Sequence, residues 1–143
     1  TIGTAFSIRE GIYDKNLVKI VLWDLAGQTG FKDLRMHSYK GASGILAVYD
    51  TTRRSTYHNV SRWILEAFDS IQDKMPPIII IGNKIDADNR EVSTDDGKRL
   101  AKKLKERTGI ESGFIEVSAK TGKNIRAAFA LILSEIIEGD TVA

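Results

Sequence analysis

The sequence of 143 residues contains no cysteine and only two histidines. The lack of cysteine excludes disulfide bonds and thiolate metal sites within the chain, and it suits a reducing compartment. His37 and His58 do not have the spacing of a pair of metal ligands. A net charge of only +2, from 21 basic and 19 acidic residues, gives no support for nucleic-acid binding. No apolar run approaches the length that spans a bilayer.

A phosphate-binding loop of the type Gly-x-x-x-x-Gly-Lys-Ser/Thr is also absent from the sequence. Gly97-Lys98 and Gly122-Lys123 lack the earlier glycine and the following hydroxyl residue, so neither can substitute for it. Ser61 and Ser118 have no histidine arrangement nearby that would activate a serine nucleophile. Residues 1–143 therefore contain no recognisable phosphate cradle and no acyl-transfer site.

The composition of 42% hydrophobic and 28% charged residues predicts one domain with a single core. Residues 5–13 and 17–23 favour β-structure and are separated by Asp14-Lys15-Asn16, which predicts an antiparallel hairpin. Residues 44–50 and 78–82 are unbroken apolar runs, typical of strands covered on both faces. Residues 114–117 form a shorter run of the same kind.

Helical periods lie between and after these runs. A first helix follows Ser55-Thr56 and a last helix ends near Gly139. Their predicted apolar stripes are Val60, Ile64, Ala67, Phe68 and Ile71, and Ile125, Phe129, Ile132, Leu133 and Ile136, respectively.

The middle helix is predicted to start after Ser93, to carry Asp95 and Asp96 in its first turn and to stop at Gly109. It is strongly basic. Its cations fit either a solvated face opposite a buried stripe or a contact with anionic lipid. The cations are Lys98, Arg99, Lys102, Lys103, Lys105 and Arg107, and the stripe is Leu100, Ala101 and Leu104.

The alternation of strands and helices predicts a mainly parallel sheet with helices on both faces, which binds ligands beyond the carboxyl ends of its strands. The first polar segment in that position is Trp23-Asp24-Leu25-Ala26-Gly27-Gln28. An acid at Asp24 can hold the water shell of Mg²⁺, and Gly27 lets a backbone N–H approach a terminal phosphate. Gln28 can orient an attacking water. Alone, Asp-x-x-Gly is more often a turn.

The second segment is Asn83-Lys84-Ile85-Asp86, directly after the run 78–82. The Asp86 carboxylate can accept two N–H bonds from the edge of guanine, where adenine has no matching donors. Asn83 can tie loops together, and the stem of Lys84 can cover the purine. The same four residues also fit a polar loop after a buried strand.

The third segment is Ser118-Ala119-Lys120, after the run 114–117. The backbone N–H of Ala119 can reach the guanine carbonyl, and the stem of Lys120 can lie over the ring. Alone, this tripeptide is also what a solvated loop leading into a helix contains.

Together and in this order, the three segments resemble signature motifs of the Ras-superfamily small GTPases: Asp-x-Ala-Gly-Gln, Asn-Lys-x-Asp and Ser-Ala-Lys. Thr1-Ile2-Gly3 resembles the Rab-type segment whose threonine coordinates Mg²⁺ and touches the γ-phosphate. Tyr39-Lys40-Gly41-Ala42 and Val48-Tyr49-Asp50-Thr51-Thr52 are also similar to Rab or Ras sequence. The resemblance covers essentially the whole chain.

The resemblance implies an α/β fold: a doubly wound, mainly parallel sheet with one antiparallel edge strand, as in a P-loop NTPase-type G domain. Residues 1–143 would be a single G domain truncated at its N-terminus, lacking the first strand, the P-loop and the first helix. In the family that strand lies between the strands of residues 17–23 and 45–50, so the chain alone should fold poorly. A piece of a longer GTPase is favoured over natural loss of the loop, and completion by a segment swapped from another copy is an alternative.

The resemblance also implies GTP or GDP and Mg²⁺ as cofactors. Mg²⁺ would be held by Thr1 and Asp24, and Gly27 and Gln28 would act in catalysis. The guanine nucleotide would be bound by Thr1, Gly27, Asn83, Lys84, Asp86, Ser118, Ala119 and Lys120.

The implied partners are an exchange factor, a GTPase-activating protein and effectors that contact the switch segments and the hairpin between them. Phe6 and Trp23 match two of the three aromatic residues that Rab effectors contact, while Ser38 replaces the third, a tyrosine. Ordinary packing of an edge hairpin explains the aromatic pair equally well. Thr29-Gly30 follow Gln28 where Rab proteins have Glu-Arg, which should loosen this segment. The expected location is the cytoplasm, with peripheral attachment to membranes through a tail outside this chain.

Two functions stay open at this point. One is a Rab-like switch in membrane trafficking or signalling that binds GTP and GDP with Mg²⁺ and hydrolyses GTP slowly. The other is a pseudo-GTPase scaffold that binds partner proteins without turnover, which the missing phosphate loop favours. Gln28, Asp86 and Lys120 argue against the scaffold, because it has no chemical need for all three.

Overall fold

The structure is a computed structural model that describes residues 4–27 and 29–142, and the chain divides into two compact units, residues 1–42 and 43–143. The single domain predicted for residues 1–143 stays a prediction.

The first unit contains the predicted hairpin, whose strands β1 (Thr4–Tyr13) and β2 (Asn16–Leu25) pair antiparallel. Asp14 and Lys15 alone make the turn, with φ values of 44° and 66°. Positive φ at both central residues is the geometry that matches the twist of the two flanking strands. Asn16 begins β2 instead of belonging to the turn, and its side-chain amide donates to the Asp14 carbonyl at 3.0 Å.

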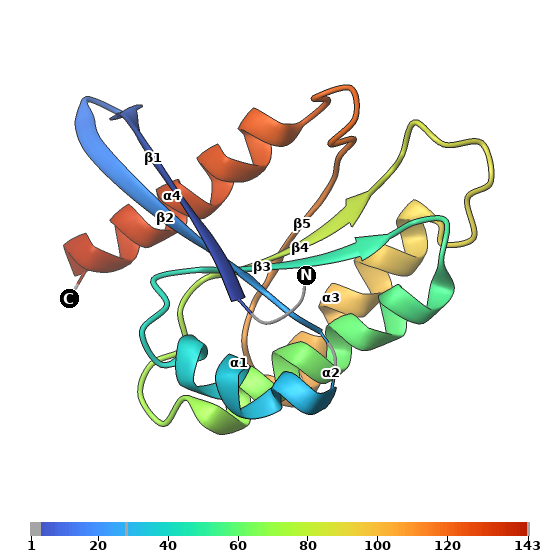
Figure 1. Ribbon diagram of the computed structural model, residues 1–143, viewed down its shortest axis with the longest axis horizontal. Helices are drawn as coiled ribbons and strands as arrows, with labels where there is room; N and C mark the ends of the chain where they lie inside the picture. Colours follow the sequence, from blue (N-terminus) through green and yellow to red (C-terminus); the bar gives the residue numbers. More distant parts are fainter. Residues whose placement is uncertain (1–3, 28, 143) are drawn as a thin grey trace. The chain divides into compact units, whose positions relative to one another are not determined.

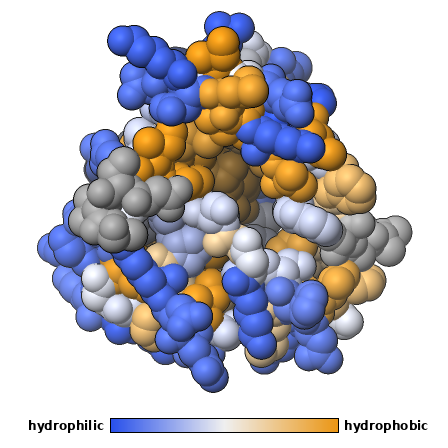
Figure 2. Space-filling model, turned by 90° about the vertical axis from the view of Figure 1, so that its left-hand side faces the viewer, coloured by the Kyte–Doolittle hydropathy of each residue, from blue (hydrophilic) through white to orange (hydrophobic). Residues whose placement is uncertain are grey.

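One face of the hairpin carries exposed apolar side chains. Phe6 and Trp23 pair across the strands, and their ring centroids are 5.5 Å apart. Two further apolar pairs lie on the same face of the hairpin, Ile8 with Val21 and Ile12 with Leu17. Figure 2 shows apolar side chains gathered at several places between hydrophilic ones on one side of the molecule.

A short helix follows the hairpin, and the sequence patterns did not predict it. The 3₁₀ turn η1 (Thr29–Phe31) leads into α1 (Lys32–Tyr39). Phe31 occupies the N-cap without a side-chain cap bond, so the usual signal for a helix start is missing. Arg35 donates from Nη1 to the Ala26 carbonyl at 2.8 Å, which ties α1 to the end of the hairpin.

The second unit contains a three-stranded parallel sheet in the order β3 (Ile45–Asp50), β4 (Ile78–Asn83) and β5 (Gly113–Glu116). The central strand β4 is buried from Ile78 to Gly82. This accounts for its unbroken apolar run, because both of its faces are covered. The predicted α/β architecture with a parallel sheet and an antiparallel pair is confirmed.

Helices cover both faces of the parallel sheet, as predicted. Figure 1 shows α2 (Arg54–Ser70) and α3 (Thr94–Thr108) on one side and α4 (Ile125–Val142) on the other. The first core gathers Val60, Ile64, Leu100 and Leu104 with Ala47, Tyr49, Ile78 and Ile80. The second core gathers Ala128 and Ile132 with Ile79, Ile81 and Val117.

Residues at the two ends of α3 determine where this helix starts and stops. The Ser93 hydroxyl accepts from the Asp96 N–H at 3.1 Å, and the Asp96 carboxylate accepts from the Ser93 N–H at 2.9 Å, which forms a capping box. Gly109 ends the helix with a φ of 74°, a conformation that disfavours residues with a Cβ. The predicted start and stop are therefore confirmed. The six cations of α3 are exposed while Leu100 and Leu104 are buried, so the buried stripe is confirmed and contact with lipid stays untested.

Three details of the prediction were wrong. Phe68 belongs to the predicted buried stripe of α2 but is 38% exposed, because it lies at the margin of the face that packs on the sheet. Val48 is 43% exposed although β3 was expected to be covered on both faces; β3 is the end strand of its sheet. Helix α4 continues past Gly139 to Val142. No helix among the described residues is long and apolar enough to cross a membrane.

Candidate functional site

Two loops of the second unit emerge at the carboxyl ends of neighbouring strands. Asn83 is the last residue of β4 and precedes Lys84 and Asp86, while Ser118 follows β5 by two residues. Because β4 and β5 pair in parallel, their carboxyl ends meet at the same edge of the sheet. The structure thus brings together the second and third polar segments of the sequence.

The side chain of Asn83 joins the two loops. Its Oδ1 atom accepts the backbone N–H of Lys84 at 2.8 Å and the backbone N–H of Ala119 at 3.0 Å. One amide oxygen has two lone pairs, so both bonds can form together. The loop-tying contact that the sequence suggested for Asn83 is present. The Ala119 N–H, which was expected to reach a guanine carbonyl, is the donor to Asn83, and its contact with guanine stays a prediction.

A second bond between the loops connects Ser118 to Asp86. The Ser118 side chain is fully buried, and its hydroxyl donates to Asp86 Oδ1 at 2.7 Å while accepting the Thr121 N–H at 3.1 Å. The bond from Ser118 lowers the pKa of Asp86 below its usual value, with smaller contributions from Lys120 and Lys84. Asp86 is exposed and is therefore an ionised hydrogen-bond acceptor near neutral pH.

Backbone and ionic contacts support the same pair of loops. The Ile85 N–H donates to the Val117 carbonyl at 3.3 Å. Farther along, Arg90 and Glu116 form an ion pair of 2.9 Å between Nη1 and Oε1. The segment after β4 is therefore attached to β5 at both of its ends.

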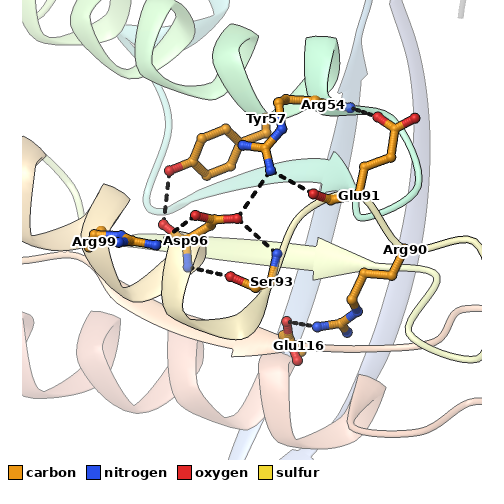
Figure 3. Close-up of polar contacts among 8 residues, drawn as sticks. All are labelled: Arg54, Tyr57, Arg90, Glu91, Ser93, Asp96, Arg99 and Glu116. Atoms are coloured by element: carbon orange, nitrogen blue, oxygen red, sulfur yellow. Dashed lines mark hydrogen bonds and ion pairs between the residues drawn. The ribbon is translucent and has the colours of Figure 1, made fainter.

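The segment from Ile85 to Ser93 is also anchored toward α2, as Figure 3 shows. Arg54 donates from its backbone N–H to Glu91 Oε2 at 2.9 Å and from Nη2 to the Glu91 carbonyl at 2.6 Å. The same guanidinium contacts Asp96 Oδ2 at 3.3 Å, and the Tyr57 hydroxyl donates to the Asp96 carbonyl at 2.9 Å. Such a network restricts the loop on the side away from β5.

Two residues at the end of β3 belong to the site although no role was predicted for them. Thr51 is fully buried, and its hydroxyl donates to the Lys84 carbonyl at 3.3 Å. Asp50 forms an ion pair with Lys84, with 2.9 Å between Oδ2 and Nζ. The available signal was their place after an apolar strand in a sheet that binds ligands at strand ends.

The segment expected to hold Mg²⁺ and the γ-phosphate belongs to the first unit. Asp24 is exposed near the end of β2, and Gly27 follows the strand by two residues. Thr1 and Gln28 lie outside the described residues. Within residues 4–27 and 29–142, no three acidic, histidine or cysteine side chains gather as a metal site. Mg²⁺ bound to nucleotide phosphates needs only one or two protein ligands, which Asp24 fits as an exposed carboxylate.

Comparison with known proteins identifies the family of the chain. A family model described as Ras family matches residues 1–138. The chain belongs to the Ras family. It is 36% identical over 140 residues to the Ras-related protein Rab-18-B of Danio rerio, covering 96% of the chain and 64% of the relative. It is 40% identical over 137 residues to the Ras-related proteins RABA4a of Arabidopsis thaliana and Rab11A of Lotus japonicus, covering 95% of the chain and 58% of each relative.

The predicted membership in the Ras superfamily and the Rab-like classification as a small GTPase are thus confirmed. This Ras-family chain spans between 58% and 64% of the length of these three relatives. The roles of individual site residues and the activity of the whole protein are matters of proposal.

Proposed function

We propose that the protein is a guanine-nucleotide switch that binds GTP and GDP with Mg²⁺ and hydrolyses GTP slowly. The observation that carries the proposal is the connection of two strand-end loops by the bonds from Asn83 to Ala119 and from Ser118 to Asp86. These bonds orient an exposed, ionised carboxylate before any ligand arrives, and orientation in advance lowers the cost of binding.

The donor and acceptor pattern of the site fits guanine. Asp86 accepts only, and guanine offers two adjacent N–H donors on its Watson–Crick edge. The exposed side chains of Lys84 and Lys120 would cover the faces of the ring with their methylene stems. Ser118 would hold Asp86, and the Ala119 N–H would be shared between Asn83 and the guanine carbonyl, since one N–H can serve two acceptors.

The other signature segment and Thr1 have separate roles in the proposal. Thr1 and Asp24 would hold Mg²⁺, which would neutralise charge on the phosphates. Gly27 would donate its backbone N–H to the γ-phosphate and Gln28 would orient the attacking water. Gln28→Leu is expected to slow hydrolysis while sparing nucleotide binding; an unchanged hydrolysis rate would remove Gln28 from the mechanism.

Turnover and reloading would depend on partners. Slow intrinsic hydrolysis calls for a GTPase-activating protein, and tight nucleotide binding calls for an exchange factor. Loss of the γ-phosphate would release Thr1 and Gly27 and relax the switch segments, which effectors would detect together with Phe6 and Trp23. A Rab-like role in membrane trafficking or signalling is part of this proposal and is supported by the similarity to Rab proteins.

The proposal requires a phosphate cradle that residues 1–143 do not contain. The first experiment therefore uses the full-length protein, denatured after purification, with the released nucleotide identified by chromatography. About one guanine nucleotide per chain is expected. Asp86→Asn should lose guanine nucleotides and gain xanthine nucleotides, because an amide N–H₂ matches the extra carbonyl of xanthine. No nucleotide, and no binding of added GTP with Mg²⁺, would contradict the proposal.

A second candidate is a scaffold of the pseudo-GTPase kind that binds partner proteins without turnover. The apolar hairpin face favours it, because Ile12 and Leu17 are 80% and 83% exposed and such surfaces often mark protein contacts. The same chromatography discriminates the two, since a folded full-length protein that binds no nucleotide is the expected result for the scaffold.

A further inference from the structure

Asp50 has a partly buried carboxylate to which the proposed function gives no role. It is the last residue of β3, and its side chain is 15% exposed while that of its partner Lys84 is 56% exposed. The Asp50 Oδ2 atom lies 2.9 Å from Lys84 Nζ. The carboxyl end of β3 is thereby connected to the segment that follows β4.

The Asp50 carboxylate is held in place by its own turn. Oδ1 accepts the backbone N–H of Thr52 at 2.8 Å and the Thr52 hydroxyl at 2.6 Å. These bonds leave Oδ2 directed toward Lys84. Burial alone would raise the pKa of Asp50, but the hydrogen bonds from Thr52 and Lys84 outweigh it and lower the pKa below its usual value. The group is therefore a fixed negative charge near neutral pH.

Hydrogen bonds also hold the backbone of Lys84 in place. Its N–H donates to Asn83 Oδ1 at 2.8 Å, and its carbonyl accepts from the Thr51 hydroxyl at 3.3 Å. Its φ of 67° lies in the left-handed region, which a residue with a Cβ adopts only where surrounding contacts favour it. Restraints on the Lys84 backbone and on Nζ limit the rotamers that the stem can adopt.

We propose that Asp50 is a positioning residue for guanine-nucleotide binding, which acts by holding the Lys84 stem where it covers the purine. This inference rests on the proposed function, because it needs a guanine nucleotide as the ligand. It predicts that the charge of Asp50 affects nucleotide affinity only while a lysine is present at position 84.

The test is a double-mutant cycle on the full-length protein, with dissociation constants for a fluorescent GDP measured by titration. Asp50→Asn keeps an oxygen that accepts from Thr52 and removes only the charge, and it is expected to weaken binding about fivefold. Lys84→Met keeps an apolar stem, and in that background Asp50→Asn should change nothing. Asp50→Glu, which keeps the charge, should retain most of the affinity.

Asp73→Asn is the matched control, because Asp73 is an exposed carboxylate between α2 and β4 and its replacement changes the net charge equally. It is expected to leave the dissociation constant unchanged. An equal effect of Asp50→Asn with lysine or methionine at position 84 would overturn the proposal, since Asp50 would then act through the fold.

Three further outcomes would overturn it. Unchanged affinity in Asp50→Asn, while Asp86→Asn loses GDP, would contradict the role of Asp50 and leave the proposed function standing. No GDP binding by the unaltered protein would overturn both. Equal weakening by Asp50→Asn and Asp50→Glu would show that the negative charge at position 50 does not hold Lys84, which also contradicts the proposal.

Discussion

Asn83 and Ala119 lie 36 residues apart in the sequence, and a hydrogen bond of 3.0 Å joins the Asn83 side-chain oxygen to the Ala119 backbone N–H. This bond and the bond from Ser118 to Asp86 hold together two loops that follow different strands. The candidate guanine site therefore depends on the pairing of β4 with β5, and its parts can be tested by stability measurements as well as by ligand binding.

Asn83→Ala should destabilise the second unit. It removes the acceptor of two backbone N–H groups, and loss of a buried or half-buried acceptor costs about 1–3 kcal/mol. Urea denaturation measures the change in the free energy of unfolding. Asn89→Ala, at an exposed position of the following loop, is the control and should change little. Equal effects of the two replacements would mean that the bonds from Asn83 contribute nothing.

Gly97→Ala should be destabilising by about 1–3 kcal/mol, because a close contact leaves no room for a methyl group. A Cβ at this position of α3 would overlap the ring of Phe114 and lie 2.8 Å from the Tyr49 hydroxyl oxygen. Thermal unfolding compares it with Gly139→Ala in α4, where nothing lies within 4 Å of the added atom. The control should be neutral or slightly stabilising, because alanine favours helix. Wild-type stability in Gly97→Ala would contradict this packing.

Tyr49→Phe should leave stability unchanged or raise it by up to about 1 kcal/mol. The Tyr49 hydroxyl is buried without a hydrogen-bond partner among the described residues. Tyr57→Phe is the matched replacement, and it should cost about 1 kcal/mol because the Tyr57 hydroxyl donates to the Asp96 carbonyl at 2.9 Å. Chemical denaturation measures the free energy of unfolding of both variants. A larger loss of stability in Tyr49→Phe than in Tyr57→Phe would mean that the Tyr49 hydroxyl has a hydrogen-bond partner.

Asp96 should contribute a stability that disappears in acid. The backbone N–H of Ser93, with further bonds from the Ser93, Arg54 and Arg99 side chains, lowers the pKa of Asp96 from 3.8 to about 2. A folded-state pKa below the unfolded value means that the stabilisation is complete above pH 3.8 and is lost as the pH falls toward 2.

The measurement is the unfolding temperature as a function of pH. Asp96→Asn should be less stable than the unaltered protein at pH 7, and the difference should shrink between pH 4 and pH 2. Asp95→Asn, in the same helical turn, is the control and should show a smaller difference at pH 7. A difference for Asp96→Asn that stays constant with pH would contradict the ionic contribution.

Local patterns predicted most of the secondary structure because their causes are local. Ser93, Asp96 and Gly109 set the bounds of α3 through contacts within one turn of the chain. Helix α1 was not predicted because this local signal is missing at its start, where Phe31 provides no cap bond. Phe68 was placed wrongly because periodicity identifies the apolar face of a helix but not how far the sheet beneath it extends.

The order of the elements, the three signature segments and their places after strands could be predicted, because they follow from residue type and spacing along the chain. The pairing of polar groups could not be predicted, and it became visible in the folded chain: Asn83 with Ala119, Ser118 with Asp86 and Asp50 with Lys84. These contacts join strand ends more than 30 residues apart, and strand order and register are set by packing across the whole sheet.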